Sequence, residues 1–340
     1  MRPASGAPTM ADVAARAGVS HQTVSRVLND ADAVRPETRE AVQRAIADLG
    51  YRRNQAARAL VTRRSGLIGV IVDELRLYGP ASTVSSVAQA AREAGYGITL
   101  DLLWDVTGSS VAAALEHQLS QAVEAVVLVA AHGETPEPSV LDGLSVPVIA
   151  LDGFLGDDKP TAGVDQRAGG VMATRHLLEL GHRTVGHITG PTDWPQAEAR
   201  LAGYREALAA AGVEPGPVVT GDWSPRAGYQ GCRRILDENP ATTALFVAND
   251  QMAMGTLRAL EEAGRNVPGD VSVVGFDDIP EATFSQPPLT TIRQDFGALG
   301  REAVRLLVGA IDGQDLPSTL VPPRLVARAS TARRPRARRR

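Results

Sequence analysis

Apolar residues recur at helical spacing in three short segments near the start of the chain. Thr9 can cap the first helix, and Asp12 follows three positions later, which is the spacing of a capping box. Gly18 ends that helix, Ser20 can cap the second, and Pro36 takes the first position of the third. The predicted helices cover residues 10–17, 21–28 and 36–49. Three short helices with a glycine turn between the first two predict a helix-turn-helix.

From Gly66 onward, short aliphatic segments alternate with longer segments of helical periodicity. The predicted strands are Leu67–Val72, Ile98–Leu103, Ala125–Val129, Val146–Leu151, Thr184–Thr189, Ala244–Ala248, Val271–Phe276 and Thr290–Ile292. The predicted helices are Ser82–Ala94, Val111–Ala122, Gly169–Leu180, Ala197–Ala211, Arg226–Leu236 and Asp250–Ala263. Such alternation favours an α/β core in which helices cover both faces of parallel sheets. This part is too long for one comfortable sheet, so we expect two doubly wound parallel-sheet subdomains with ligands at a crevice beyond the strand ends.

The composition is that of a chain with two or three globular domains and no disulfide. The 340 residues are 44% hydrophobic, 22% charged and only 4% aromatic, and Cys232 is the single cysteine. No apolar segment approaches the roughly 18 residues that a membrane helix needs, and residues 1–15 lack the apolar core of a signal peptide. We therefore expect a cytoplasmic protein without membrane association.

Basic residues concentrate at the two ends of the chain. Residues 1–65 hold 11 basic and 6 acidic side chains, and residues 333–340 hold six arginines and no acid. Since the whole chain has 35 basic and 39 acidic residues, the part between keeps 18 basic and 33 acidic ones. A basic N-terminal unit on an acidic body indicates a module that binds a polyanion. The arginine-rich end is expected to be disordered, and non-specific DNA binding and a merely solvated tail stand as equal alternatives for it.

The second predicted helix presents side chains that suit base edges. Gln22 and Arg26 are four residues apart and share a face, because Val24 and Val27 take the inward face. Gln fits adenine and Arg fits guanine in the major groove, and short hydroxyl side chains suit phosphates. The predicted DNA contacts on this helix are Ser20, His21, Gln22, Thr23, Ser25 and Arg26. A merely solvated face is the alternative for an isolated helix.

The segment TMADVAARAGVSHQTVSRVLN at residues 9–29 resembles the DNA-binding headpiece of the LacI family of bacterial transcription repressors. The segment YRRNQAARAL at residues 51–60 resembles the hinge helix of that family. The resemblance implies a near-palindromic double-stranded operator, a homodimer, and Leu60 wedged into the minor groove to unstack a base step. The further DNA contacts that it implies are Asn29, Asn54, Ala57 and Leu60. Arg53 stands where the family usually has proline, which removes a fixed φ before the hinge helix.

The resemblance extends over nearly the whole chain. The segments that carry it are ARLAGY (199–204), GDWS (221–224), VANDQMA (247–253), VVGFDD (273–278) and PPLTTIRQDF (287–296). They match a galactoside-responsive member of the family, which implies a periplasmic-binding-protein-like core with a small sugar, expected to be a galactoside, between its subdomains. The effector contacts that the resemblance implies are Asp152, Arg200, Trp223, Asn249, Asp277, Gln294 and Phe296. Leu77 and Pro80, in the loop expected at Asp73–Pro80, are expected to add an apolar wall.

The chemistry of these residues suits a neutral sugar. Carboxylates accept hydrogen bonds from sugar hydroxyls, a guanidinium donates a planar fork, and aromatic faces cover the C–H side of a pyranose. Each residue also has a structural alternative, such as a turn residue for Asp152. We assign Asn249 to the ligand and Asp250 to helix capping. We expect one of the adjacent residues Asp277 and Asp278 to be structural.

The sequence indicates no other chemistry. No metal-ligand spacing links the histidines, and neither a phosphate-binding glycine loop nor a nucleophile elbow is present. We therefore expect no metal, no cofactor and no catalytic residue. An enzyme that acts on a sugar through Asp152 and Asp277 and a sugar-transport protein are the alternatives, and the headpiece argues against both. The competitor that stays open is a repressor of the same family that responds to another glycoside or to a non-sugar corepressor.

The predicted domain boundaries follow from these patterns. They are 1–50 for the helix-turn-helix, 51–65 for the hinge, 66–164 with 296–323 for the first core subdomain, 165–295 with 324–332 for the second, and 333–340 for the tail. No leucine heptad follows the core, so we expect a dimer and not a tetramer. In the implied mechanism, a sugar bound between the subdomains rotates them and releases the operator, with a coupling free energy of about 1–3 kcal/mol.

Overall fold

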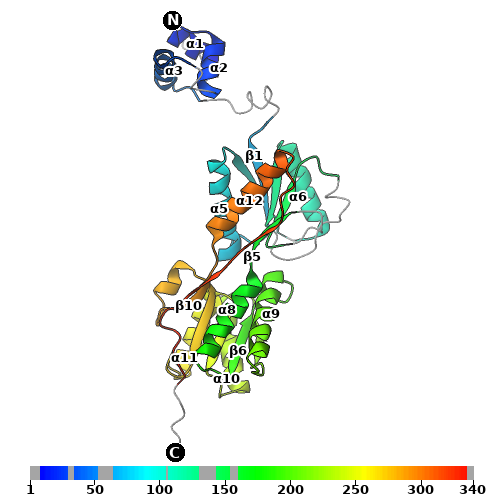
Figure 1. Cartoon of the computed structure of the whole chain (residues 1–340), viewed down its shortest axis with the longest axis vertical. Helices are drawn as coiled ribbons and strands as arrows, with labels where there is room; N and C mark the ends of the chain where they lie inside the picture. Colours follow the sequence, from blue (N-terminus) through cyan, green and yellow to red (C-terminus); the bar gives the residue numbers. More distant parts are fainter. Residues whose placement is uncertain are drawn as a thin grey trace, which may run out of the picture. The chain divides into compact units, whose positions relative to one another are not determined.

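The computed structural model describes residues 8–29, 34–52, 64–104, 106–129, 143–153 and 160–334. The chain divides into two compact units, Met1–Ser65 and Gly66–Arg340, whose elements are coloured along the sequence in Figure 1. Several expected DNA contacts lie outside the described residues, namely Asn54, Ala57, Leu60 and the side chain of Asn29. Within the described residues, no helix is long and apolar enough to cross a membrane.

The first unit is the predicted helix-turn-helix. Its helices are α1 (Met10–Ala17), α2 (His21–Asn29) and α3 (Pro36–Leu49). The predicted capping box is present: the Thr9 hydroxyl accepts from the Asp12 N–H at 3.3 Å, and the Asp12 carboxylate accepts from the Thr9 N–H at 2.8 Å. Gly18 ends α1 with a φ of 67°, a left-handed conformation that glycine adopts at little cost. The core between the helices centres on Val13, Val24 and Val42.

Replacing Thr9 with alanine should loosen the first helix without touching the second unit. Loss of an N-cap typically costs about 1 kcal/mol, so we expect headpiece amides to exchange their hydrogens roughly fivefold faster. Thr9→Ser, which keeps the hydroxyl, is the matched control. Peptide-resolved hydrogen exchange on the full chain makes the measurement, and unchanged exchange in Thr9→Ala would show that the cap does not limit headpiece opening.

The second unit contains two lobes, each built on a six-stranded sheet with helices on both faces (Figure 1). The sheet of the N-lobe has the order β11-β5-β4-β3-β1-β2, and its neighbouring strands run parallel. Its strands are β1 (Leu67–Val72), β2 (Gly97–Leu102), β3 (Ala125–Val129), β4 (Val148–Leu151), β5 (Thr161–Val164) and β11 (Thr319–Val321). Helices α5 (Tyr78–Glu93) and α12 (Phe296–Ile311) pack on one face, and α6 (Gly108–Ser120) packs on the other.

The sheet of the C-lobe has the order β12-β10-β9-β8-β6-β7 and is parallel except for the antiparallel edge strand β12. Its strands are β6 (Val185–Thr189), β7 (Val218–Thr220), β8 (Ala244–Val247), β9 (Ser272–Asp277), β10 (Thr290–Arg293) and β12 (Arg324–Val326). Helices α8 (Gln166–Glu179) and α9 (Pro195–Ala210) pack on one face, and α10 (Pro225–Glu238) and α11 (Asp250–Glu262) pack on the other. The two doubly wound parallel-sheet subdomains that the sequence predicts are therefore confirmed.

Two parts of the core differ from the sequence predictions. The helix expected from Ser82 begins at Tyr78, so Leu77 is its N-cap and Pro80 lies in its first turn and not in a loop. Proline fits there because the first N–H groups of a helix have no partner within it. Helix α12 and the strands β5, β7, β11 and β12 are not among the predicted elements. These strands have only three or four residues, too few to show an alternating pattern.

Candidate functional site

A cleft lies between the two lobes, at the carboxyl ends of strands from both sheets. About 570 Å³ of space there is not filled by protein atoms, and part of that space is open solvent. The nine expected effector contacts all line it: Leu77, Pro80, Asp152, Arg200, Trp223, Asn249, Asp277, Gln294 and Phe296. Lining side chains that the sequence analysis does not include are Tyr78, Thr83, Gln166, Trp194 and Gln196. The fold thus brings together residues from both lobes in the crevice expected for a parallel α/β sheet.

Arg200 of α9 is the central cation of the cleft and is only 5% exposed. Its Nε donates to Gln166 Oε1 at 2.9 Å, its Nη1 donates to the Ala248 carbonyl, and its Nη2 lies 3.5 Å from a carboxylate oxygen of Asp277. The guanidinium carbon lies 3.7 Å from the centroid of the Phe276 ring. Burial lowers the pKa of Arg200, and the neighbouring carboxylates oppose that effect. These contacts hold the guanidinium plane in one orientation, as recognition through a planar fork requires.

The two adjacent carboxylates at the end of β9 have different environments. The side chain of Asp278 is only 3% exposed and accepts from two cations, Arg293 and Arg328. Asp277 lines the cleft, and one of its oxygens accepts from Gln294 Nε2 at 2.7 Å. Burial raises the pKa of Asp277 to about 6, against the opposing effect of the nearby guanidinium. The expectation that one of the pair is structural is confirmed, and that residue is Asp278.

Asp152 brings a second, partly buried carboxylate to the cleft from the N-lobe. It follows β4 with a φ of 52°, and its Oδ1 accepts from the Val164 N–H at 2.7 Å. Its backbone carbonyl accepts from Gln196 Nε2 of the C-lobe at 3.1 Å, so this residue is bonded to both lobes. Burial raises the pKa of Asp152 to about 6. Two carboxylates beside one guanidinium leave an excess of negative charge, which disfavours an anionic ligand.

The roles assigned to Asn249 and Asp250 need correction. Asn249 is the N-cap of α11, since its Oδ1 accepts from the Met252 N–H at 2.9 Å. Asp250 does not cap: its buried carboxylate accepts from the Ile279 N–H at 2.9 Å and from the Thr291 hydroxyl at 2.6 Å. An N-cap needs extended backbone at the helix boundary, and Asn249 has it with a φ of −148°. Asn249 also lines the cleft, so capping and a ligand contact do not exclude each other.

Aromatic rings line the cleft on the sides of both lobes. Trp194 and Trp223 of the C-lobe form an edge-to-face pair with centroids 5.4 Å apart, and Tyr78 and Phe296 of the N-lobe helices form another at 5.8 Å. Trp223 has a φ of 69°, a backbone conformation that large side chains rarely adopt. The Trp223 Nε1 and the Gln196 Oε1 are buried without a hydrogen-bond partner among the described residues. Such atoms beside an apolar wall suit a ligand that carries hydroxyl groups.

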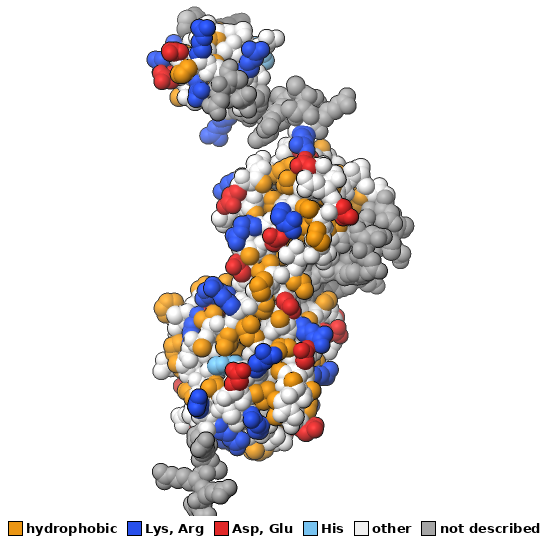
Figure 2. Space-filling model, in the orientation of Figure 1, with side chains coloured by type: hydrophobic (Ala, Val, Ile, Leu, Met, Phe, Trp, Pro, Cys, Tyr) orange, Lys and Arg blue, Asp and Glu red, His pale blue; other side chains and the backbone are white. Residues whose placement is uncertain are grey.

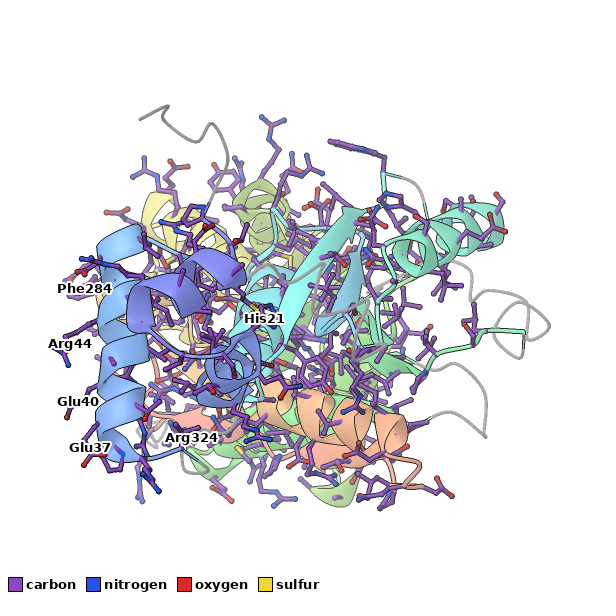
Figure 3. The ribbon with its side chains drawn as sticks, turned by 90° about the horizontal axis from the view of Figure 1, so that it is seen from above. His21, Glu37, Glu40, Arg44, Phe284 and Arg324 are labelled. Atoms are coloured by element: carbon purple, nitrogen blue, oxygen red, sulfur yellow. The ribbon has the colours of Figure 1, made fainter. Side chains whose placement is uncertain are left out.

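The outward face of α2 carries the expected base-reading side chains. The exposed side chains on this helix and its cap are Ser20, His21, Gln22 and Arg26. Thr23 and Ser25 are half-buried. Val24 and Val27 are buried against the other two helices, as predicted. The Ser20 hydroxyl oxygen accepts from the Thr23 N–H at 3.1 Å and so begins the helix. A different exposed face, on α3, carries Glu37, Glu40 and Arg44, which Figure 3 shows along that helix.

The histidines and acids of the described residues form no group of three or more that could hold a metal ion. His182 bonds the Thr243 hydroxyl at 3.0 Å and the Ala332 carbonyl at 3.1 Å, which makes it a connecting residue. His187 is fully buried and stacks 4.4 Å from the Phe246 ring, and burial lowers its pKa to about 4. Both ring nitrogens of His182 are thus bonded within the fold, whereas the buried Nε2 of His187 has no hydrogen-bond partner among the described residues.

Two families match parts of the chain. The family described as "Bacterial regulatory proteins, lacI family" matches residues 9–54, and the "Periplasmic binding protein-like domain" matches residues 174–331. The HTH-type transcriptional regulator CelR of Thermobifida fusca is 41% identical over 335 residues, covering 94% of this chain and 95% of that protein. Both matched families agree with the two units seen in the structure.

Solved structures match over almost the whole chain. The lac repressor dimer bound to operator and the anti-inducer ONPF is 34% identical, covers 96% of this chain and 100% of that chain, and has a TM-score of 0.82. The CelR–cellobiose complex is 38% identical, covers 95% of this chain and 99% of that chain, and has a TM-score of 0.72. With these matches over nearly its full length, the chain belongs to the LacI family of bacterial transcriptional regulators, with a helix-turn-helix headpiece and a periplasmic-binding-protein-like core.

Proposed function

We propose that this chain is a sequence-specific repressor that a small neutral glycoside releases from its operator. One observation carries the proposal: a cleft lined by polar and aromatic side chains of both lobes lies in a chain whose other unit is a helix-turn-helix. A ligand in that cleft contacts both lobes at once, so it favours one relative orientation of them. The relatives named above are regulators, and we expect no turnover of the sugar.

In the proposed site, Asp152 and Asp277 accept hydrogen bonds from sugar hydroxyls and Arg200 donates to sugar oxygens. Aromatic rings cover the apolar face of the pyranose. The remaining proposed contacts are Leu77, Pro80, Trp223, Asn249, Gln294 and Phe296. The buried Gln196 Oε1 is available to accept one further hydroxyl. Together these groups serve a neutral polyhydroxylated ligand better than an anion, because the cleft already holds excess negative charge.

A galactoside is the proposed effector, and a β-glucoside such as cellobiose is the second candidate. The galactoside is supported by the segments around Arg200, Asp277 and Gln294, which resemble the lactose repressor. Cellobiose is supported by the CelR of Thermobifida fusca, which is 41% identical, and by the solved CelR–cellobiose complex, which is 38% identical. A response to a purine or to another non-sugar corepressor would exclude both sugar candidates.

On the DNA side, we propose a homodimer that reads a near-palindromic operator through α2. The hinge contacts proposed with it are Asn54, Ala57 and Leu60, and we retain the domain boundaries expected from the sequence. Because the proposed operator is part of bacterial DNA, we expect the protein to act in the cytoplasm. Sedimentation at micromolar concentration should give a dimer, and a tetramer would contradict this assembly.

The test is release of operator DNA. Operators are first selected from a random duplex pool, and fluorescence anisotropy then measures the operator Kd with and without each ligand. We expect galactosides to raise the Kd by roughly 5- to 150-fold, which corresponds to a coupling of about 1–3 kcal/mol. Asp277→Asn, which keeps an oxygen for Gln294 but removes the charge, should bind operator normally and lose the response. An operator Kd that no glycoside changes, or that glycosides lower, would overturn the proposal.

Glycoside affinity should fall as the pH is lowered through 6. In the free cleft, Asp152 and Asp277 both have a pKa raised to about 6 by burial, and a bound sugar hydroxyl favours the ionised form. Protons must leave before the sugar binds at low pH, so we expect roughly tenfold weaker binding at pH 5.5 than at pH 7.5. Isothermal titration calorimetry at both values measures this, and equal or tighter binding at pH 5.5 would contradict it.

A further inference from the structure

Four polar side chains of the cleft form a closed ring of three hydrogen bonds and one ion pair. Arg200 Nε donates to Gln166 Oε1 at 2.9 Å, and Gln166 Nε2 donates to Gln294 Oε1 at 2.8 Å. Gln294 Nε2 donates to Asp277 Oδ1 at 2.7 Å, and the same oxygen lies 3.5 Å from Arg200 Nη2, which closes the ring. Gln166 is the one member of this ring that the proposed effector contacts do not include.

The chemistry of the charged members fixes the orientation of both amides in the ring. A guanidinium only donates, so the Gln166 oxygen faces Arg200 and its NH2 group faces Gln294. An ionised carboxylate only accepts, so the NH2 group of Gln294 faces Asp277. Reversing either amide would place two donors or two acceptors against each other. The donors therefore run in one direction around the ring, and Gln166 carries this direction from Arg200 to Gln294.

Gln166 also adjoins the carboxylate that the N-lobe brings to the cleft. Burial raises the pKa of Asp152 to about 6, and a hydrogen bond from the Gln166 side chain is one of the effects that oppose this rise. The NH2 group of Gln166 has two hydrogens, which suffice for Gln294 and Asp152 together. One side chain is thus placed between the guanidinium of the C-lobe and the carboxylate of the N-lobe.

Gln166 lies where the chain crosses from one lobe to the other. It is the first residue of α8 in the C-lobe, two positions after the end of β5 in the N-lobe. Gln294 directly follows β10 of the C-lobe and precedes α12 of the N-lobe by two positions. The ring therefore ties two crossings between the lobes to side chains that are proposed to hold the sugar, Arg200 and Asp277.

The ring is buried and leaves one carboxylate oxygen free. Its four residues are at most 7% exposed, whereas most charged side chains of the core lie at the surface, where Figure 2 shows Lys and Arg intermixed with Asp and Glu. Asp277 makes both of its ring contacts through Oδ1, and its Oδ2 accepts no hydrogen bond from the described residues. Oδ2 is thus left for a sugar hydroxyl, whereas both polar atoms of Gln166 are bonded within the protein.

We propose that Gln166 is a positioning residue of the effector site, which orients Arg200 and Gln294 and through them presents Asp277 to the sugar. The inference rests on the proposed function, since it concerns how the same cleft holds a neutral glycoside. Without Gln166, Gln294 keeps a bonded partner at one end only, and Arg200 loses the acceptor of its Nε. Both side chains can then turn, and the sugar has to order them when it binds.

The test is isothermal titration calorimetry of the full chain with a thio-galactoside and with cellobiose. The variant is Gln166→Met, which keeps the length of the side chain and removes both polar atoms. For the glycoside that the unmodified chain binds, we expect the Kd to rise by about tenfold or more, because bonds to charged groups are lost. The operator Kd measured without glycoside should change by less than about twofold.

Gln118→Met is the matched control. Gln118 of α6 is also buried and bonded, since its Oε1 accepts from the Thr99 hydroxyl at 2.5 Å and its Nε2 donates to Asp101 at 3.0 Å, but it does not line the cleft. This variant should lose melting temperature as Gln166→Met does and keep the glycoside Kd of the unmodified chain. It separates the loss of a buried amide from the loss of the ring.

Two further variants test the direction of the ring. Gln166→Glu keeps an acceptor for Arg200 but has no donor for Gln294, so we expect it to bind the glycoside about as weakly as Gln166→Met. It also serves as the test if Gln166→Met does not fold. In a double-mutant cycle with Gln294→Met, the double variant should raise the Kd by about threefold or more less than the product of the two single effects, because both break the same ring.

The outcomes separate this proposal from the function on which it rests. An unchanged glycoside Kd in Gln166→Met, full affinity in Gln166→Glu, or single effects that simply multiply would overturn the role of Gln166 and leave the proposed function standing. An equal rise of the Kd in Gln118→Met would overturn that role as well. If the unmodified chain binds neither glycoside, it is the proposed function that is overturned, and the ring has no sugar to position.

Discussion

Arg200→Ala is expected to destabilise the core by about 3–5 kcal/mol and to abolish the response to the effector. The guanidinium is 5% exposed, and without it the carboxylate of Asp277 keeps Gln294 as its bonded partner. The Gln166 side chain and the Ala248 carbonyl each lose a donor as well. The Asp277 carboxylate is then buried without a cation, and the Gln166 and Ala248 oxygens lose the hydrogen bonds that Arg200 donates. Removing one partner of a buried ion pair costs more free energy of unfolding than removing both.

The loss of free energy of unfolding in Arg200→Ala should depend on pH. Because the pKa of Asp277 already lies at about 6 in the folded protein, the carboxyl in the variant takes up a proton readily as the pH falls. The destabilisation should therefore be smaller at pH 5.5 than at pH 8. Urea denaturation at both values measures it, and an equal loss at the two values would show that the unpaired carboxylate is not its cause.

Arg200→Lys is the matched control for this prediction. It keeps a cation beside the carboxylates but loses the planar fork that bonds Gln166 and Ala248 together. We expect a protein that folds close to normally and binds the glycoside at least tenfold more weakly. Full effector affinity in Arg200→Lys would mean that the charge alone, and not the geometry of the fork, matters.

Gln22→Ala and Arg26→Ala should each relax the base preference at one position of the operator half-site. Both side chains are exposed on α2, and a bidentate contact to a base edge typically discriminates by about 1–3 kcal/mol. The preferred base pair should therefore lose roughly tenfold or more of its advantage in each variant. Binding to a set of operators with single base-pair changes makes the measurement.

Arg44→Ala controls for a general loss of positive charge in the headpiece. Arg44 is exposed on α3, in the face that also carries Glu37 and Glu40 (Figure 3). Its removal should leave the base preference at every position unchanged. If Gln22→Ala and Arg26→Ala also leave the preference unchanged, α2 is not the base-reading helix.

The elements that the sequence predicts well are those whose boundaries are set locally. The capping box of Thr9 and Asp12 and the left-handed Gly18 and Gly50 fix the helices of the headpiece from neighbouring residues alone. Strands β7 and β11 have three residues and depend on pairing with distant partners, which no local pattern shows. Helix α12 is different, because Leu299, Ala303 and Leu307 are buried at a spacing of four that the sequence does contain.

For the candidate site, the spacing of residues along the chain does not predict which strand ends lie next to one another in the fold. Asp152, Asn249 and Asp277 follow or end strands of two different sheets, and only the family resemblance collects them before the fold is known. Gln196 had a local signal, since it precedes Arg200 by one helical turn and shares its face. The capping of α11 by Asn249 and not by Asp250 had no such signal, because both residue types cap helices and only the backbone decides between them.

The most direct test of a glycoside site between the lobes is a melting-temperature panel on the full chain. It compares galactose, lactose, allolactose, a thio-galactoside, cellobiose, maltose, a sugar phosphate and a purine base, with Arg200→Lys beside the unmodified protein. A ligand at a hundred times its Kd adds about 2.7 kcal/mol, which raises the melting temperature by several degrees. We predict such a shift with a galactoside, and a shift no more than about half as large in Arg200→Lys at the same ligand concentration. A shift with the purine base or the sugar phosphate alone, or a galactoside shift of undiminished size in Arg200→Lys, would contradict the site.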